Sequence, residues 1–411
     1  MARGPLLIGE RLRRLPFQRG EGPYWNPRKR EGDKMWRFLA VFVSVALLMP
    51  VGRASDTGKS DRGKKEEIVK TEFTTEKFVE RVNQAGGRVD FVFEEDRPFK
   101  SCHASTVVEA EDGSPVCAWF GGTAEKNPDV GIWMSRFVQG KWAPVQVAAK
   151  VNQTAHWNPV LFRDRETKDP DRKGVFLFFK VGPDTPAWQT YWMRSQNNGV
   201  TWSQPVELVP GDAGGRGPVK NKPIVLADGA WLAPASTEHK GWKPFADRSE
   251  DGGKSWRRSE DFVIDRKATR CNGAIQPTFW ESAPGTVHAL LRTANGCILR
   301  TDSHDSGKTW DPVYRTALPN NNSGIDALRL EDGRILLVYN PVGRNWGKRT
   351  PLTLAVSKDN GKRWKNLVHL ETAPGEYSYP TVVRTTRGVA VSYTWKRERV
   401  RCWQIPLDAL K

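Results

Sequence analysis

The chain has 411 residues, a formal net charge of +17, and hydrophobic residues at 38% of its positions. The positive charge suits an anionic partner, but no recognition helix, zinc-ligand spacing or aromatic RNA-binding platform accompanies it, so we expect no nucleic acid partner. The five cysteines have no close pair spacing and the six histidines are scattered, which predicts neither a metal site nor a cofactor.

The N-terminal part reads as an extension with a signal peptide, residues 1–54. An apolar run of 14 residues, 38–51, follows Trp36 and Arg37 and precedes Gly52-Arg53-Ala54, which has small residues where a signal peptidase reads. We therefore expect a secreted or periplasmic protein that uses a signal peptide near residues 35–54. The run is shorter than the about 20 residues of a spanning helix, so we expect no stable membrane insertion, with an uncleaved anchor as the alternative.

Residues 55–87 form a linker with one predicted element. The stretch 55–67 is charged and of low complexity, which is typical of a disordered segment. Residues 74–85, closed by Gly86 and Gly87, have the pattern of a short helix.

From residue 88 onward the chain repeats a unit that begins with a polar-headed strand. There are six such strands, which begin at Cys102, His156, Lys220, Ile275, Ser323 and Tyr377. Each unit continues with an apolar strand and a third strand, and four short antiparallel strands per repeat are typical of a propeller blade whose first strand lines the axis. Residues 88–411 are therefore predicted to form an all-β, six-bladed β-propeller whose polar strand heads converge.

A turn pattern recurs on the outer side of these units. Ser, an Asp or Asn two residues later, Gly and a final Trp appear four times, with the Trp at 202, 256, 310 and 364, each 54 residues after the previous one. A fixed period of this length indicates a repeat architecture, and Asp or Asn with a following Gly predicts a tight turn. The first role that we predict for the pattern is structural: it forms a turn in the fold.

The last unit stops after its third strand, residues 399–405, without a fourth strand. We predict that residues 88–94 supply the missing outer strand, since this closure removes the exposed sheet edge of an open ring.

The turn pattern resembles the Asp-box, and residues 89–407 resemble the sialidase superfamily in its bacterial sialidase-like, BNR-repeat branch. The resemblance implies an exo-sialidase with a Tyr nucleophile, a Glu that polarises it, an Asp acid/base and three Arg that clamp the substrate carboxylate. A neutral phenol suits this chemistry because the carboxylate of a sialic acid would repel an anionic nucleophile. The four turns alone do not decide function, since non-catalytic propellers also carry them.

Several family positions have counterparts here. The Tyr-Ser motif falls on Tyr377-Ser378, which makes Tyr377 the candidate nucleophile, and Tyr379 is a candidate wall of the pocket. Two clamp arginines correspond to Arg292 and Arg349, with Arg344 as an alternative for the second. The alternative for both tyrosines is simple packing at the axis.

Other positions depart from the family. His103 stands where the first clamp Arg is expected, and Gln276 replaces the Glu; glutamine can hydrogen-bond a phenol but cannot accept its proton. Asp326 or His103 is the candidate base in its place. The acid/base Asp corresponds best to Asp129, with Glu125 as the substitute.

The remaining strand heads complete a predicted polar ring that is rich in cationic, aromatic and phenolic groups. They are His156, Trp157, Asn158, Lys220, Lys222 and Asn322. This composition suits an acidic glycan or sialoglycoconjugate substrate, and the hypothesis is an exported, monomeric, sialidase-like glycoside hydrolase. Two alternatives stay open: a uronate-directed lyase or glycosidase with His103 and Tyr377 as base and acid, and a non-catalytic glycan-binding propeller.

Overall fold

The computed structural model describes residues 70–411, which belong to a compact unit that covers Glu66–Lys411. The predicted signal peptide near residues 35–54 and the linker 55–67 lie outside the described residues. Within residues 70–411, no helix is long and apolar enough to cross a membrane.

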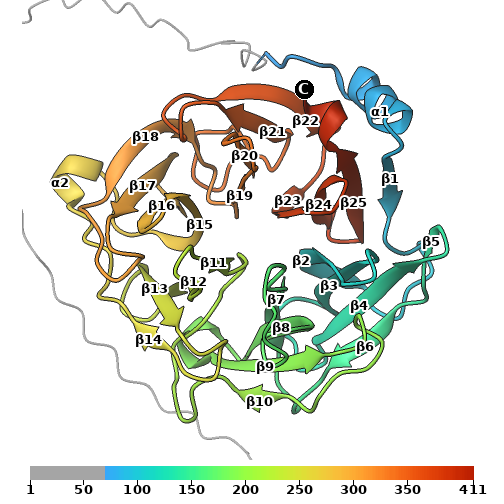
Figure 1. The fold of residues 1–411 in the computed structure, drawn as a ribbon, viewed down its shortest axis with the longest axis horizontal. Helices are drawn as coiled ribbons and strands as arrows, with labels where there is room; N and C mark the ends of the chain where they lie inside the picture. The colour runs from blue at the N-terminus through green and yellow to red at the C-terminus, as the bar shows by residue number, and fades with distance from the viewer. Residues whose placement is uncertain (1–69) are drawn as a thin grey trace, which may run out of the picture. The chain divides into compact units, whose positions relative to one another are not determined.

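The unit is an all-β propeller of six antiparallel sheets arranged in a ring (Figure 1), which confirms the predicted fold. Blade one contains β2 (Ser101–Glu109), β3 (Pro115–Gly122), β4 (Gly131–Val138) and β5 (Lys141–Trp142), and β6 (Gln146–Ala149) also pairs with β4. Blade two contains β7 (His156–Phe162), β8 (Val175–Val181), β9 (Gln189–Ser195) and β10 (Val206–Glu207), with a 3-10 turn η1 (Thr185–Ala187). Blade three contains β11 (Ile224–Val225), β12 (Trp231–Thr237), β13 (Lys243–Ser249) and β14 (Arg257–Arg258), followed by α2 (Arg266–Thr269).

The second half of the ring has the same plan. Blade four contains β15 (Ile275–Ala283), β16 (Thr286–Arg292), β17 (Cys297–Ser303) and β18 (Tyr314–Pro319). Blade five contains β19 (Asp326–Arg329), β20 (Ile335–Tyr339), β21 (Leu352–Ser357) and β22 (Lys365–Glu371). Blade six contains β23 (Tyr377–Arg384), β24 (Gly388–Trp395), β25 (Arg399–Pro406) and, from the other end of the chain, β1 (Arg88–Phe91), with η2 (Leu407–Leu410) at the end.

The ring closes where the first and last strands meet. β1 pairs antiparallel with β25, so that Val89 lies opposite Trp403, as predicted. The preceding helix α1 (Thr75–Gln84) begins at Thr74, whose side chain accepts a hydrogen bond from the Lys77 backbone N–H. Phe78 and Val82 of α1 are fully buried in the same apolar cluster as Trp403. The helix and β1 thus cover the outer side of blade six.

The turn motifs of blades three, four and five share one hydrogen-bond pattern, and the motif of blade two has the two bonds of its serine, Ser195. In blade five, the Ser357 hydroxyl accepts from the Gly361 N–H at 2.8 Å and donates to Asp359 at 2.9 Å, and the Trp364 indole N–H donates to the Gly361 carbonyl at 3.1 Å. Blades three and four repeat these three bonds around Ser249 and Ser303. The turns are therefore built by their own side chains.

Each turn also docks onto the preceding blade. Gly307 has a φ of +77°, and a Cβ at this position would lie 2.6 Å from the Leu232 side chain of blade three. Only glycine combines the left-handed backbone with this close approach. The motif therefore seals the contact between neighbouring blades as well as forming a turn.

At the inner end of every blade, one residue at or just before the first strand has a positive φ. These residues are Ala104, Asn158, Lys220, Gln276, Asn322 and Tyr379, with φ between 41° and 65°. In four blades the strand pairing shifts register at this point, which is the signature of a β-bulge. Such bulges re-aim side chains, and here they do so around the axis.

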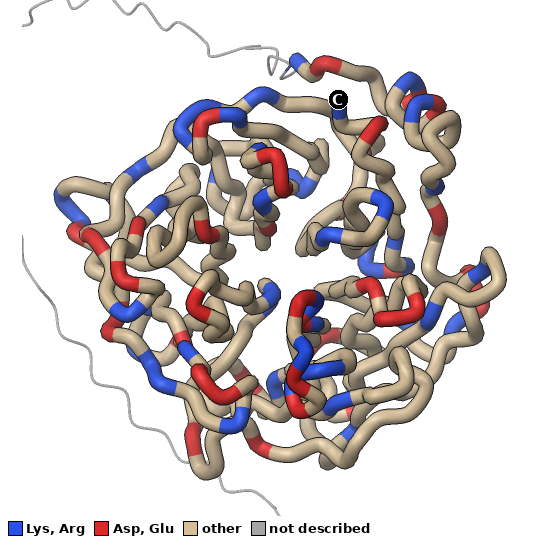
Figure 2. The backbone as a smooth tube through the Cα atoms, viewed as in Figure 1, with Lys and Arg blue, Asp and Glu red and all other residues tan. Residues whose placement is uncertain are grey.

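Charges are distributed around the whole ring. Figure 2 shows Lys and Arg interspersed with Asp and Glu in all six blades, rather than gathered into one basic stripe. The large apolar side chains lie in the interior, and Trp119, Trp231, Trp280 and Trp403 are among the fully buried ones.

Candidate active site at the strand heads

The bulges bring a tyrosine, a glutamine and an arginine into contact near the axis. The Arg292 guanidinium, at the end of β16, donates through Nη1 to the Tyr379 hydroxyl at 2.5 Å and to Gln276 Oε1 at 2.9 Å. Through Nε and Nη2 it donates to Asn322 Oδ1 at 3.1 and 2.9 Å. Blades four, five and six thus contribute to one contact. We call these four residues, together with the surrounding residues His103, Glu125, Glu238, Trp242, Arg349, Glu376 and Arg397, the axial cluster.

Arg292 is a buried cation held by neutral acceptors. Its exposed fraction is 5%, and no carboxylate among residues 70–411 forms an ion pair with it. A buried guanidinium without a counter-charge is costly, and an anionic ligand would supply that charge. The Trp242 and Tyr379 rings also flank it, at 5.7 and 5.4 Å from the guanidinium carbon.

Two further arginines surround one carboxylate beside Tyr379. Glu376 accepts from Arg349 at 2.6 Å and from Arg397 at 3.0 Å, and Arg397 also pairs with Glu125 at 2.5 Å. Burial alone would raise the pKa of Glu376, but Arg349 and Arg397 outweigh it and lower this pKa below its usual value. Glu376 is therefore ionised at neutral pH.

His103 lies against Tyr379 and is neutral. The two ring centroids are 4.2 Å apart, and His103 Nδ1 lies 2.9 Å from the Thr394 hydroxyl. Burial, followed by the nearby Arg397, Arg349 and Arg292, lowers the pKa of His103 well below its usual value. The positive charges of these arginines make protonation of its imidazole unfavourable.

One carboxyl in this region has a raised pKa. Burial raises the pKa of Glu238, in the loop after β12, with Arg292 lowering it and Glu125 raising it further. Such a carboxyl keeps its proton to a higher pH than an exposed one and can donate it.

Lys220 holds the backbone beside Tyr379 through hydrogen bonds. Lys220 is 3% exposed, and its ammonium group donates to the Pro380 carbonyl, next to Tyr379, and to the Ile325 carbonyl at 2.8 Å. It therefore ties the backbone of blades five and six to blade three.

Tyr377 does not lie in the axial cluster, which corrects its expected position. Its side chain is 1% exposed and packs in the apolar cluster of blades five and six, with its ring 6.2 Å from that of Trp395. Tyr377 and Tyr379 would share a face in a regular strand, but the left-handed φ of 52° at Tyr379 and the register shift between Ser378 and Thr381 break the alternation. Tyr379 is consequently the tyrosine that meets Arg292 and His103.

Asp326 and Lys222 form a salt bridge with each other. The Lys222 ammonium lies 2.8 Å from Asp326, which also accepts from the Thr278 hydroxyl and the Val382 N–H, both at 2.8 Å. With every oxygen occupied, Asp326 is a structural link between blades rather than the expected base, and Lys222 is its counter-ion.

The blade-one loop presents Glu125, not Asp129, to the axial cluster. Asp129 accepts from the Thr123 N–H at 2.8 Å and hydroxyl at 3.0 Å, which closes its own loop. Glu125 reaches Arg397, so the carboxylate expected as the substitute is the one that joins the cluster.

The three predicted residues of blade two have mainly structural surroundings. His156 is buried, accepts from the Val151 N–H at 2.8 Å and stacks on Phe179. Trp157 is 4% exposed and donates its indole N–H to the Gly182 carbonyl at 2.8 Å. Asn158 occupies the bulge position that Gln276 and Tyr379 hold in their blades.

Sequence reasoning missed Glu376, Arg397, Glu238 and Trp242. Arg397 follows β24 just as Arg292 ends β16, so the end of the second strand of each blade was the usable signal. Glu238 and Trp242 lie in a loop whose course no sequence pattern fixes. No group of three or more His, Cys, Asp or Glu within residues 70–411 is placed to hold a metal ion.

Comparison with known proteins gives one family. A family model described as BNR repeat-like domain matches residues 113–391. No curated protein matches the sequence significantly.

Solved structures with the same fold are distant in sequence. The Hadza microbial sialidase Hz136 is 17% identical with a TM-score of 0.64, covering 79% of this chain and 69% of its own. A protein of unknown function from Dyadobacter fermentans is 18% identical with a TM-score of 0.60, covering 77% and 98%. The NanB sialidase from Streptococcus pneumoniae is 14% identical with a TM-score of 0.59, covering 78% and 71%. These likenesses show the sialidase-like fold.

Proposed function

This chain belongs to the BNR repeat-like domain family, and from that membership we propose that it is a glycoside hydrolase of the sialidase type acting on a terminal acidic sugar. The observation that carries the proposal is the contact between a phenol and a buried guanidinium that has no carboxylate partner among the described residues, Tyr379 with Arg292. This contact places a neutral nucleophile, the Tyr379 phenol, beside a cation that can bind the substrate's carboxylate, the Arg292 guanidinium.

Arg292 is the group that binds the substrate carboxylate. Its present acceptors, Gln276, Asn322 and Tyr379, are neutral, so a carboxylate replaces weaker partners with a charge-assisted pair. Arg349 and Arg397 already share Glu376, and they add positive potential without being fully available.

Tyr379 is the nucleophile in this proposal. Its oxygen bonds to the anomeric carbon while the bond from that carbon to the aglycone oxygen breaks, Glu238 donates its proton to the leaving oxygen, and the phenol's proton passes to the neutral imidazole of His103. The adjacent guanidinium of Arg292 stabilises the negative charge on the phenolic oxygen as its proton leaves. Water then hydrolyses the tyrosyl–sugar bond, which releases the free sugar and restores the phenol. Gln276 orients Arg292 and takes the place of a carboxylate that would polarise the phenol directly.

The test compares two tyrosines on one strand. We expect the purified protein to release a free acidic sugar from sialoside or uronate-capped substrates, and Tyr379→Phe to lower kcat by about 1000-fold or more because the nucleophile is removed. Tyr377→Phe is the matched control, and it should keep kcat within about threefold while lowering the melting temperature slightly, as expected for a core position. Equal activity losses in both variants, or an active Tyr379→Phe protein, would refute the assignment.

One observation favours elimination as the second candidate. The neutral His103 imidazole and the Tyr379 phenol face each other beside Arg292, and this set can abstract and donate protons at a uronate without a covalent intermediate. Product analysis separates the two reactions, since an ultraviolet-absorbing unsaturated uronate indicates elimination and a saturated free sugar indicates hydrolysis.

A further inference from the structure

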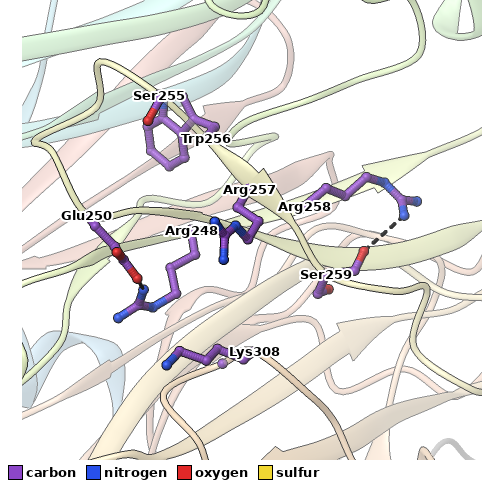
Figure 3. A pocket seen from close by; sticks show the side chains of 9 residues that line it. Arg248, Glu250, Ser255, Trp256, Arg257, Arg258, Ser259 and Lys308 are labelled. Carbon is purple, nitrogen blue, oxygen red and sulfur yellow. Dashed lines mark hydrogen bonds and ion pairs between the residues drawn. The ribbon is translucent and has the colours of Figure 1, made fainter.

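A hollow lies on the outer side of blades three and four. It has a volume of about 370 Å³ and is lined by side chains of β13, β14 and the turn motif of blade four. Figure 3 shows Arg248, Arg257 and Lys308 gathered on one side of the strand pair, with Ser255 and Trp256 beside them and Arg258 directed toward Ser259. None of these residues contacts the axial cluster described above.

The hollow holds like charges that the sheet itself places together. Arg248 of β13 and Arg257 of β14 are direct partners in the antiparallel register, an arrangement that is destabilising for two cations. Lys308, in the turn motif of blade four, is a third cation at this hollow. The close approach of the neighbouring Gly307 to Leu232 fixes the position of that turn. Three cations therefore converge from two blades.

The local carboxylates balance only part of this charge. Arg248 pairs with Asp228 at 2.7 Å and with Glu250, and Arg258 pairs with Asp261. Arg257 and Lys308 have no ion pair with any residue in the described range 70–411, and the buried Nε of Arg248 has no hydrogen-bond partner there. The hollow thus offers two unpaired cations and one unused buried donor.

We propose that this hollow binds an anionic group, sulfate or carboxylate, of an acidic glycan, as a site separate from the axial cluster. Its volume lies within the range of about 300–1000 Å³ that is usual for small-ligand pockets. The partly buried Trp256 ring at its edge offers an apolar face to a sugar. A nucleic acid would instead require cations that follow a phosphate track, whereas Lys and Arg are interspersed with Asp and Glu around this ring (Figure 2).

The test uses two double variants that remove the same charge. Arg257→Ser with Lys308→Ser empties the hollow of its unpaired cations, and Lys168→Ser with Lys358→Ser removes two exposed lysines elsewhere on the surface. The probe is a chondroitin sulfate hexasaccharide, titrated calorimetrically at low ionic strength, with inorganic sulfate as a competitor. We expect the hollow variant to bind the hexasaccharide at least about tenfold more weakly, the loss of one or two charge-assisted contacts, and the control variant to change less than about twofold.

Three results would overturn the proposal. Equal weakening in both double variants would show a net-charge effect, and unchanged binding in the hollow variant would exclude the site. A single-stranded DNA 12-mer that binds as tightly as the hexasaccharide and with the same dependence on Arg257 and Lys308 would replace the glycan with nucleic acid as the ligand. Melting curves establish that each variant is folded, and Lys308→Gln alone repeats the measurement with a smaller change if the double variant does not fold.

Discussion

At the scale of single residues, Lys180 is a charged side chain in the interior of blade two. It is fully buried, and its ammonium donates to the Thr190 hydroxyl at 2.7 Å and to the Arg216 carbonyl at 2.8 Å. Burial lowers the pKa of Lys180 to about 7, with Asp247 and Asp212 opposing the shift. The folded protein therefore holds this proton less tightly than the unfolded chain does.

This difference predicts a pH-dependent effect of Lys180→Met. Below pH 7 the lysine is protonated in both states, whereas between pH 7 and the unfolded value near 10.4 the unfolded chain binds more protons, so the stability of the parent protein rises with pH. The variant lacks this contribution, and its stability relative to the parent should fall by about 2 kcal/mol between pH 7 and pH 9. The Arg216 carbonyl keeps its bond from Thr190, so no acceptor is orphaned.

Urea unfolding at both pH values measures this effect. The exposed Lys168→Met is the matched control and should show a pH-independent difference from the parent. A difference for Lys180→Met that stays constant from pH 7 to pH 9 would contradict the lowered pKa.

The residues of the axial cluster could be named from the sequence only in part. The pattern placed His103, Gln276 and both tyrosines on inner strands, because strand heads are marked by polar residues before an apolar run. It also placed Arg292 at the end of β16 and Arg349 just before β21. It could not decide between Tyr377 and Tyr379, since alternation predicts one face for both and a single left-handed residue breaks that rule. Glu376 and Arg397 were missed because they lie beyond strand ends, where no periodicity applies.

At the scale of elements, the turn motif was readable because the hydrogen bonds that form it are local. Ser357, Asp359, Gly361 and Trp364 lie within eight residues and bond to one another. The inner strands of blades three and five were less readable: they were expected to begin at Lys220 and Ser323, but β11 and β19 begin only at Ile224 and Asp326. The side-chain amide of Asn221 donates to the carbonyls of Gln276 and Pro277, so blade four holds the segment that precedes β11.

Ser357→Ala tests the turn as a stability device. The substitution leaves the buried Gly361 N–H without its 2.8 Å acceptor, and an unsatisfied buried donor costs about 1–3 kcal/mol. We expect the free energy of unfolding to fall by that amount, seen as a lower urea midpoint with an unchanged slope, because the turn is local and the ring stays closed.

The adjacent Lys358→Ala is its control, since Lys358 is exposed and its side chain lies outside the turn's hydrogen bonds. If Ser357→Ala unfolded like the parent protein, the turn motif would contribute nothing to stability.

At the scale of the whole molecule, the ring depends on a strand from its own N-terminal side. β1 completes blade six, and α1 covers the cluster around Trp403 with Phe78 and Val82. The six-blade count and the closing strand were predictable because the last repeat visibly lacks its fourth strand. The packing of α1 onto that blade was not, because a short helix pattern does not show where the helix docks.

Removing the closing segment should open the ring. We compare a chain that begins at residue 70 with one that begins at residue 93, which lacks α1 and β1. Loss of two fully buried side chains, at about 1.5–3 kcal/mol each, and of the β25 pairing should lower the melting temperature by about 10 °C or more and expose a sheet edge that promotes aggregation. Calorimetry and light scattering measure both effects, and identical melting of the two chains would show that closure by β1 is dispensable.

The pairing of β1 with β25 also means that the ring can close only after the last strand has been synthesised. The ribosome makes β1 before any other strand of the propeller, and its partner emerges only after five blades have been synthesised. At about 5–20 residues per second this interval lasts tens of seconds, during which the nascent chain has no way to complete its circle. We therefore expect a chaperone to be required to protect the unpaired strand edges of the nascent chain from aggregation until translation ends.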